Sequence, residues 1–311
     1  MAESSTDFSH LMARAGGELA RQTAPPLPAG LYAVATPIGN LGDITLRALA
    51  VLARADIILC EDTRHSRTLL AHFAITAPMR PYHEHNAARE RPRVLAELAE
   101  GKRIALISDA GTPLISDPGW KLMREAIDAG HRVEALPGAS APLVALTIAG
   151  LPTDAFLFAG FLPPKSAARQ TRIRELAGVP ATLVFFESPT RAPEAMADLA
   201  AVLGPRPAAL ARELTKLHEQ VLRGSLDGLA AELAERPVKG ECVILVGAPV
   251  VTAAIDDDVV AHLQRALADM SLRDASKAVS EALNVPKNRV YELGLQLRQS
   301  GGDDGADDAE S

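Results

Sequence analysis

The stretch Ser108-Asp-Ala-Gly-Thr-Pro-Leu-Ile-Ser-Asp-Pro-Gly119 decides the fold that this sequence predicts. It follows the apolar run 103–108, which is typical of a strand buried in a parallel sheet. The segment after it, 120–129, has the apolar spacing of a helix. Ligands bind at this kind of strand-to-helix edge, because the helix N-terminus offers free N–H donors there. We therefore expect a small polar ligand at this loop.

On both sides of this loop, short apolar runs alternate with amphipathic stretches. In the first half of the chain, strands are predicted at 31–35, 56–60, 103–108 and 132–136. Strands that alternate with helices indicate parallel βαβ units and an α/β layer fold. After residue 151 the pattern continues, but the runs 208–212 and 219–223 have no helix between them. The second sheet is therefore expected to be mixed.

The sequence divides into five expected parts. They are a flexible N-terminal arm (1–29), an N-terminal α/β domain (30–150), a second α/β domain (151–249), a helical domain like a helix-turn-helix (256–298) and an acidic disordered tail (299–311). No apolar run approaches the length of a membrane span, and the N-terminus lacks the apolar core of a secretory signal. Cys60 and Cys242 lie inside apolar runs, which is typical of free core thiols in a reducing compartment. A cytoplasmic location is expected.

The net charge of −7 argues mildly against a nucleic-acid partner, but the charges are unevenly distributed. Acidic residues gather in the run 256–258 and in the C-terminal tail. Basic residues gather at 64–67, 89–93, 165–174 and 287–289. Each basic cluster is consistent with an ordinary solvated face, although a local positive groove could bind phosphates. The overall charge therefore does not identify the partner.

Four polar loops follow predicted strands of the first block. They are 36–43, 61–64, 108–119 and 136–140. In a parallel sheet all four loops meet at one edge. Their shared position favours the interpretation as a ligand site over the interpretation as four unrelated structural turns.

These loops carry recognisable motifs. The motifs are Thr36-Pro-Ile-Gly-Asn-Leu-Gly-Asp-Ile-Thr45, Glu61-Asp-Thr-Arg64, Ser108-Asp-Ala-Gly-Thr-Pro113, Leu136-Pro-Gly-Ala-Ser140, Gly160-Phe-Leu-Pro163 and Ala211-Arg-Glu-Leu-Thr-Lys216. Over residues 31 to about 247 the chain resembles the ribosomal-RNA-methylating members of the tetrapyrrole methylase superfamily. The resemblance implies two α/β domains with a cofactor cleft between them, plus a small C-terminal helical domain. It also implies a homodimer that uses S-adenosylmethionine to methylate a ribose 2′-hydroxyl of a decoding-centre cytidine in 16S rRNA of the small ribosomal subunit.

The same resemblance points to individual cofactor contacts. They are Pro37, Ile38, Gly39, Asp109, Gly111, Thr112, Pro113, Ile115, Ser140, Ala141, Phe186 and Arg212. The superfamily has a Gly-Asp-Pro segment where this chain has Gly111-Thr112-Pro113. Since Thr112 carries no charge, Asp109 is expected to supply the negative charge near the cofactor.

Methyl transfer to a ribose hydroxyl requires alignment and is helped by a base or by a hydrogen-bond acceptor. Glu61 and Asp62 are candidates for base or for substrate positioning, and Arg64 for pairing with them or clamping a phosphate. Lys216 is a further candidate, either beside the hydroxyl or on the RNA backbone. The alternative interpretation of 61–64 is a capped helix start that only holds its loop.

Basic residues on two predicted helical segments are candidates for RNA contact. Lys165, Arg169 and Arg172 have helical spacing and share one face, whereas Lys277, Lys287 and Arg289 lie in the C-terminal helix-turn-helix pattern. A solvated face and a simple packing hairpin are the respective alternatives. His83 and His85 would share a face of a strand, but no third ligand accompanies them, so no metal is expected.

Two other functions compete with rRNA methylation. One is C-methylation of a precorrin-type tetrapyrrole, which the same fold performs. The other is a helix-turn-helix DNA-binding regulator with a metabolite-sensing α/β domain. The acidic net charge and the loops aimed at one edge argue against the regulator.

Overall fold

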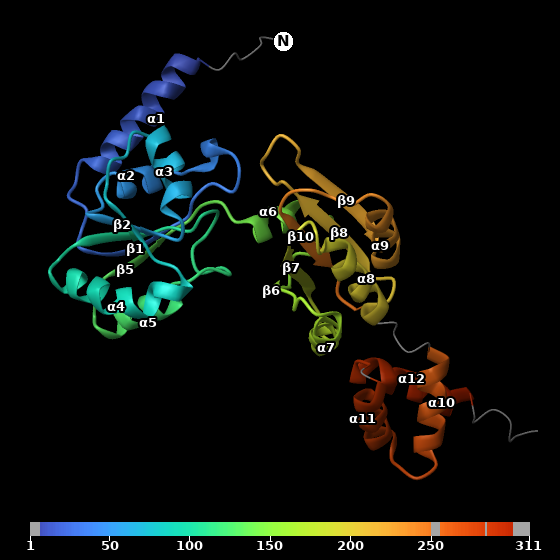
Figure 1. Cartoon of the computed structure of the whole chain (residues 1–311). Helices are drawn as coiled ribbons and strands as arrows, with labels where there is room; N and C mark the ends of the chain where they lie inside the picture. The colour runs from blue at the N-terminus through green and yellow to red at the C-terminus, as the bar shows by residue number, and fades with distance from the viewer. Residues whose placement is uncertain (1–6, 250–255, 284, 301–311) are drawn as a thin grey trace, which may run out of the picture. The chain divides into compact units, whose positions relative to one another are not determined.

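The computed structural model describes residues 7–249, 256–283 and 285–300. The chain forms two compact units, Met1–Pro249 and Val250–Ser311. Figure 1 shows the helices and strands of each unit. Among the described residues, no helix combines the length and apolar character needed to cross a membrane.

The first sheet of the larger unit is entirely parallel. Its strands are β1 (Gly30–Val34), β2 (Ile57–Cys60), β3 (Met79–Pro81), β4 (Arg103–Leu106) and β5 (Val133–Leu136), in the order β3-β2-β4-β1-β5. The short strand β3 was not predicted, because three residues that end in proline carry little periodicity. The sequence did predict the other four strands, and their parallel pairing confirms the βαβ pattern.

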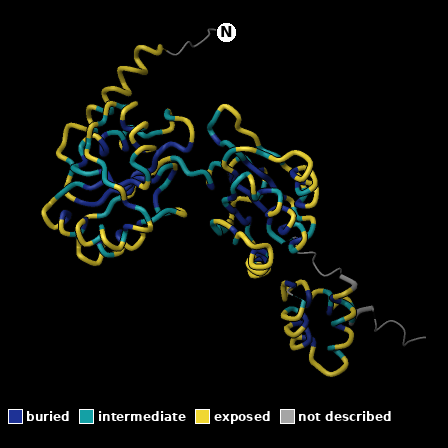
Figure 2. The backbone as a smooth tube through the Cα atoms, viewed as in Figure 1, coloured by how far each residue is buried: buried dark blue, intermediate teal, exposed yellow. Residues whose placement is uncertain are grey.

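Helices cover both faces of this sheet. They are α2 (Leu46–Leu52), α3 (Thr63–His72), α4 (Glu84–Ala99) and α5 (Trp120–Asp128), with a short 3-10 turn at Leu41–Asp43. Alternate residues of β1 point to opposite layers: Tyr32 packs with Leu52 of α2, and Leu31 packs with Leu122 of α5. Figure 2 shows the resulting buried strands between more exposed helices. Both faces of β1 are therefore buried, as its apolar run predicts.

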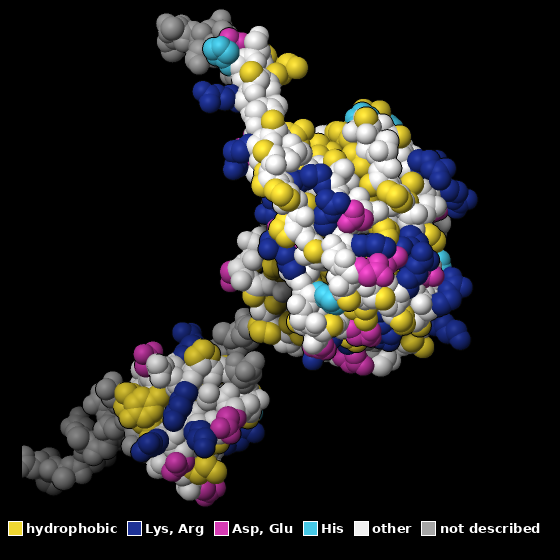
Figure 3. Space-filling model, turned by 90° about the vertical axis from the view of Figure 1, so that its left-hand side faces the viewer, with side chains coloured by type: hydrophobic (Ala, Val, Ile, Leu, Met, Phe, Trp, Pro, Cys, Tyr) yellow, Lys and Arg dark blue, Asp and Glu magenta, His cyan; other side chains and the backbone are white. Residues whose placement is uncertain are grey.

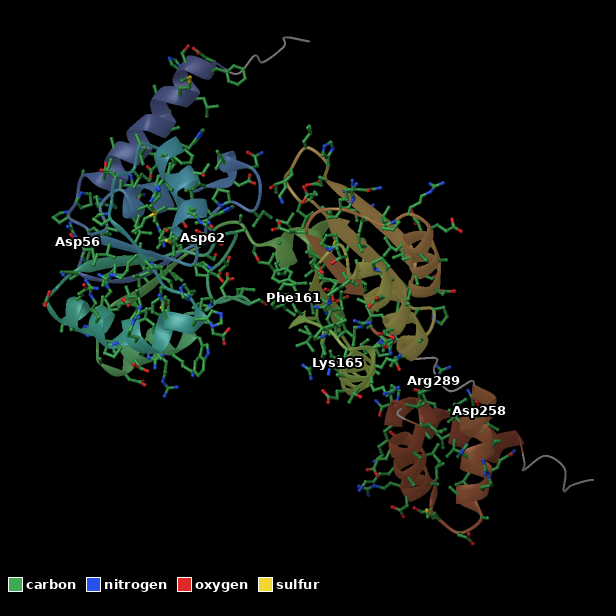
Figure 4. The ribbon with its side chains drawn as sticks, in the orientation of Figure 1. Asp56, Asp62, Phe161, Lys165, Asp258 and Arg289 are labelled. Atoms are coloured by element: carbon green, nitrogen blue, oxygen red, sulfur yellow. The ribbon has the colours of Figure 1, made fainter. Side chains whose placement is uncertain are left out.

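An ion pair joins β2 to β4 at the end of the sheet away from the loops. Asp56 and Asp62 flank β2 at its two ends (Figure 4). The Asp56 carboxylate accepts hydrogen bonds from the backbone N–H of Arg103 at 2.8 Å and from its Nε at 2.9 Å. These bonds with Arg103 hold the pKa of Asp56 below its usual range.

Replacing Asp56 with asparagine is expected to lower the free energy of unfolding by about 1 kcal/mol at pH 7, since the pair is one-third exposed. The lowered pKa means that this stabilisation is present above the unfolded-state pKa of about 4 and is lost as pH falls through the folded-state value. Urea unfolding at pH 7 and at about pH 3 checks this. The wild type and the variant should differ at neutral pH and converge in acid; an equal difference at both would contradict the assignment.

The second sheet of the same unit is mixed, as predicted. Its strands are β6 (Phe156–Phe161), β7 (Thr182–Glu187), β8 (Pro207–Arg212), β9 (Gln220–Ser225) and β10 (Cys242–Val246), in the order β6-β7-β10-β8-β9. β6 and β7 are parallel, and the other pairs are antiparallel. One face is covered by α7 (Ser166–Leu176), α8 (Ala192–Leu203) and α9 (Leu226–Glu235).

Helix α6 (Ala141–Ile148) covers the other face of the second sheet. It follows β5 in the chain, yet Ala145 and Leu146 pack with Val184 of β7 and Val243 of β10. Ile38, from the loop after β1, belongs to the same apolar cluster. The expected boundary at residue 150 therefore separates the two sheets in sequence, whereas one apolar cluster joins them in space.

The expectation of a flexible arm over 1–29 is wrong for most of the described residues in that range. Phe8–Thr23 form the helix α1, whose N-cap Asp7 accepts a hydrogen bond from the N–H of Ser9 at 2.9 Å. α1 packs against α2, and Arg54 donates to the carbonyl of Pro25 at 2.6 Å. Its large apolar residues Phe8, Leu11 and Met12 have helical spacing but are exposed, and the small and polar residues around them favoured the interpretation as an arm.

The smaller unit contains α10 (Asp256–Leu267), α11 (Leu272–Leu283) and α12 (Lys287–Ser300). Each helix packs against both others around a small apolar core, which includes Leu263, Val279 and Val290. Three helices fit the helix-turn-helix-like domain that the sequence predicts here. The predicted disordered tail lies outside the described residues, except that 299 and 300 belong to α12.

Candidate functional site

The four motif loops meet at the carboxyl edge of the first sheet and are tied together there. Thr36 and Gly111 exchange backbone hydrogen bonds of 2.9 and 3.0 Å. The Thr112 hydroxyl donates to the carbonyl of Ala139 at 3.1 Å. These hydrogen bonds fix the positions of the loops after β1, β4 and β5 relative to one another.

A cavity of about 370 Å³ opens at this edge. Its lining comes from both sheets: Ile38, Ala110, Gly111, Thr112, Ile115, Ser116, Asp117, Ser140, Ala141, Pro142, Phe161, Phe186, Glu187, Ser188, Pro189, Leu214, Glu241, Cys242 and Val243. Concave, mostly apolar cavities with a few polar groups are typical of small-molecule sites.

The backbone around the cavity is strained at four non-glycine positions. Leu114 and Ser116 have φ values of 74° and 68°, and Glu213 and Thr215 have φ values of 50° and 65°. The first pair lies in the loop after β4, and the second pair flanks the cavity residue Leu214. Left-handed backbone at non-glycine residues is costly and clusters at ligand sites. The strained backbone therefore occurs in two segments of the cavity, the loop after β4 and the segment 213–215 after β8.

Aromatic rings form one side of the cavity. The ring centroid of Phe186 lies 4.9 Å from that of Phe158 and 5.5 Å from that of Phe161. Phe161, which Figure 4 labels at the end of β6, is 57% exposed although it faces a cavity. Such rings offer flat apolar surface for a planar ligand group.

The three carboxylates of the cavity differ in their partners. Glu187 is fully buried and accepts from Arg191 at 3.1 Å, and Glu241 accepts from Lys216 Nζ at 3.0 Å. Asp117 is half-buried and has no Lys, Arg or His partner within the described parts of the chain. Burial raises the pKa of Asp117 to about 6, with a further contribution from the charges of Glu61 and Asp109.

Residues 30–230 match the sequence model of the tetrapyrrole (corrin/porphyrin) methylases. The chain belongs to the tetrapyrrole methylase family. Residues 253–298 match a second model, the RsmI C-terminal HTH domain.

Two curated relatives share the name Ribosomal RNA small subunit methyltransferase I. The protein of Mesorhizobium japonicum is 51% identical over 90% of this chain and 96% of its own length. That of Micromonospora olivasterospora is 45% identical over 93% and 94%. The resemblance found in the motifs is thereby confirmed.

A solved structure shows the same fold. Uroporphyrin-III C-methyl transferase from Thermus thermophilus, complexed with S-adenyl homocysteine, matches with a TM-score of 0.51 and 21% identity. The match covers 70% of this chain and 97% of that one. Together with the family match, it confirms the predicted α/β architecture of this tetrapyrrole methylase.

Seven of the twelve expected cofactor residues line the cavity of this tetrapyrrole methylase. They are Ile38, Gly111, Thr112, Ile115, Ser140, Ala141 and Phe186. Pro37, Gly39, Asp109, Pro113 and Arg212 lie outside the lining. Arg212 donates instead to Gln220 Oε1 at 2.8 Å and to the carbonyl of Lys239 at 3.1 Å. Asp109 accepts from the N–H of Asp62 at 3.2 Å.

None of the four catalytic candidates lines the cavity. Asp62 is the N-cap of α3, and Arg64 donates to it through its backbone N–H at 2.7 Å and through Nη2 at 2.9 Å. The Arg64 bonds hold the pKa of Asp62 at about 2. Lys216 is held between Glu213 and Glu241. The hydrogen bonds between Asp62 and Arg64 fit the alternative interpretation, a capped helix start. Glu61 is exposed, and its charge acts on Asp117.

The expectation that Lys165, Arg169 and Arg172 share an exposed face that contacts RNA is wrong for Arg169. Its side chain is 2% exposed and bonds through Nε to Asp198 at 2.6 Å. Lys165, labelled in Figure 4 at the start of α7, is exposed, and Arg172 is exposed but pairs with Glu175. Helical spacing placed the three residues on one side of α7, but α8 covers part of that side.

The remaining candidates lie on surfaces. Lys277, Lys287 and Arg289 are exposed on α11 and α12. Figure 3 shows Lys and Arg side chains mixed with Asp and Glu on the drawn face of the smaller unit. His83 precedes α4 and His85 lies in its first turn, so the strand expected there is wrong. Within the described residues, no three His, Cys, Asp or Glu side chains are grouped as a metal site would require.

Sequence reasoning missed several lining residues. Asp117 lies in the loop 108–119 and Phe161 in the motif 160–163, but the sequence singled out neither as a site residue. The residues 187–189 and 241–243 form another wall of the cavity, and none of them was chosen from the sequence. These residues reach the site only because β7 and β10 pair in the second sheet.

Proposed function

We propose that this chain transfers a methyl group from S-adenosylmethionine to the ribose 2′-hydroxyl of a decoding-centre cytidine in 16S rRNA. The observation that carries the proposal is the cavity, which the motif loops of the first sheet build and the second sheet completes. The rRNA substrate is supported by the relatives at 51% and 45% identity, whose names specify the small ribosomal subunit.

The residues of the cavity fit this donor. Phe161 and Phe186 suit a flat purine, and the backbone around Gly111 can approach a ligand without a side chain between them. Asp117 supplies a negative charge for a cationic ligand. A structural neighbour of the same fold was solved with S-adenyl homocysteine.

When bound, the donor supplies an electrophilic methyl group, and the residues of the chain align the acceptor with it. Glu61 is exposed beside Asp117, where it would accept a hydrogen bond from the incoming ribose hydroxyl. Asp62 and Arg64 would hold that loop in place. Lys216, fixed by two carboxylates, would contact a phosphate at the rim.

Transfer of labelled methyl groups tests the proposal. Purified protein and labelled S-adenosylmethionine are offered assembled small subunits, free 16S rRNA, precorrin-type tetrapyrroles and DNA in parallel. Label on a ribose of 16S rRNA is the expected result, with either assembled or free RNA as the better acceptor. Label on the tetrapyrrole, or on none of the four, would overturn the proposal.

The homodimer and the cytoplasmic location expected from the sequence belong to the same proposal. Sedimentation of the full chain measures the first, and a dimer is the expected result. Cell fractionation of a tagged chain measures the second.

We expect Lys277 and Lys287 of the C-terminal unit to contact rRNA phosphates, together with Arg289 and with Lys165 and Arg172 of the larger unit. The double variant Lys277→Glu, Lys287→Glu should bind small subunits more weakly. It should also reduce the slope of log affinity against log salt by about 1.5, because two phosphate contacts are lost. Filter binding at several salt concentrations measures both quantities. An unchanged slope would remove these two residues from the interface.

A further inference from the structure

Asp117 is the cavity carboxylate whose charge is not neutralised by a neighbour. Glu187 is bonded to Arg191, and Glu241 is bonded to Lys216. The groups that face Asp117 are acidic or neutral: Glu61 after β2, Asp109 and the Ser108 hydroxyl after β4. Burial and two neighbouring carboxylates disfavour the ionised form of such a group, and a bound cation stabilises that form.

The backbone on both sides of Asp117 adopts unusual conformations. Ser116 before it has a left-handed φ of 68°, and Gly119 after it has a φ of 132° that brings the backbone against Leu106 and Leu114. A Cβ at position 119 would lie 2.7–2.8 Å from those two leucine side chains. The loop therefore presents Asp117 to the cavity at the cost of strain, which is typical of a ligand-binding position.

We propose that the Asp117 carboxylate binds the positive charge of the methyl donor at its sulfonium group. This inference rests on the proposed function, because it takes the donor to be S-adenosylmethionine. It also assigns to Asp117 the role that the sequence analysis expected of Asp109, which is to supply the negative charge near the cofactor. Asp109 lies outside the cavity lining and accepts a backbone hydrogen bond from Asp62.

The chemistry of the sulfonium selects this kind of partner. A sulfonium has no N–H or O–H to donate, so it is stabilised by a nearby negative field and not by directed hydrogen bonds. Asp117, Glu61 and Asp109 provide such a field at one side of the cavity. The product S-adenosylhomocysteine is a neutral thioether at the same atom, so the donor and the product differ in the group that Asp117 recognises.

Calorimetric titration of the full chain with donor and with product tests the inference. The Asp117→Asn variant should weaken S-adenosylmethionine binding roughly tenfold or more and S-adenosylhomocysteine binding by less than about threefold. Asp117→Glu, which keeps the charge, should retain most of the preference for the donor. Glu84→Gln is the matched control, because it removes an exposed carboxylate at the same sheet edge outside the cavity, and it should change neither affinity.

Product binding also shows that each variant is folded. Equal losses for donor and product in Asp117→Asn, or loss of donor preference in Asp117→Glu, would overturn the inference. If the wild type binds neither molecule, the proposed function itself fails, which is a different result.

Proton release gives a readout that does not depend on affinity. A bound sulfonium lowers the pKa of Asp117 from its value of about 6, so donor binding near pH 6 should release protons and should weaken as pH falls further. The heat of donor binding should then depend on the buffer's ionisation enthalpy more than the heat of product binding does. In Asp117→Asn that difference should disappear; its persistence would place the proton on Glu61, Asp109, Glu187 or Glu241 and contradict the inference.

Discussion

Methyl transfer is expected to fall roughly a hundredfold in the Gly39→Ala variant, because the two walls of the cavity touch at this glycine. A Cβ at position 39 would lie 2.4 Å from Lys216 Cγ, 2.9 Å from Thr215 Oγ1 and 3.0 Å from the carbonyl oxygen of Leu214. The last contact is backbone, so the segment 213–216 must move away. Ile38 and Leu214, on either side of the contact, both line the cavity.

The measurement is steady-state methyl transfer together with calorimetric affinity for the donor. Gly42→Ala is the control in the same loop, since its Cβ would meet the flexible Asn40 side chain at 3.2 Å. Its activity should remain within about twofold of wild type, because that side chain can shift. Equal activity in the Gly39 and Gly42 variants would show that contact between these walls does not shape the site.

Asp198→Ala is expected to lower the free energy of unfolding by about 3–5 kcal/mol, because it removes the nearest counter-charge of the buried Arg169 guanidinium. The two side chains are 2% and 11% exposed and join α7 to α8. Asp198 also accepts from Ser166 at 3.0 Å and from Gln170 at 2.7 Å. No other carboxylate among the described residues is as close to Arg169.

Glu194→Ala is the matched control for this prediction. Glu194 lies 3.6 Å from Arg169 but is 73% exposed, so its removal should cost less than about 1 kcal/mol. Urea unfolding at neutral pH measures both variants. Similar small losses in the two would show that Arg169 reaches water when Asp198 is removed.

The sequence predicted most of the larger unit because the central strands of its sheets are buried on both faces. Apolar runs such as 103–106 have no helical period, and the parallel order then brings the loops to one edge. α1 was missed although Phe8, Leu11 and Met12 have helical spacing, because the segment is rich in small and polar residues and none of its side chains is buried.

The candidate site was predicted on the side that the motif loops build. Gly111 and Ser140 follow strands directly, so the parallel sheet alone places them together. The opposite wall depends on how the second sheet pairs, which sequence spacing does not specify. Helical spacing likewise misplaced Arg169, since its partner Asp198 belongs to another helix.

A crystal structure of the full chain with S-adenosylhomocysteine tests whether the cavity holds the methyl donor. We predict the bound molecule between Phe186 and the loop at Gly111, with its sulfur on the side of Asp117. Binding at any other place on the chain, with this cavity free of the molecule, would contradict the claim.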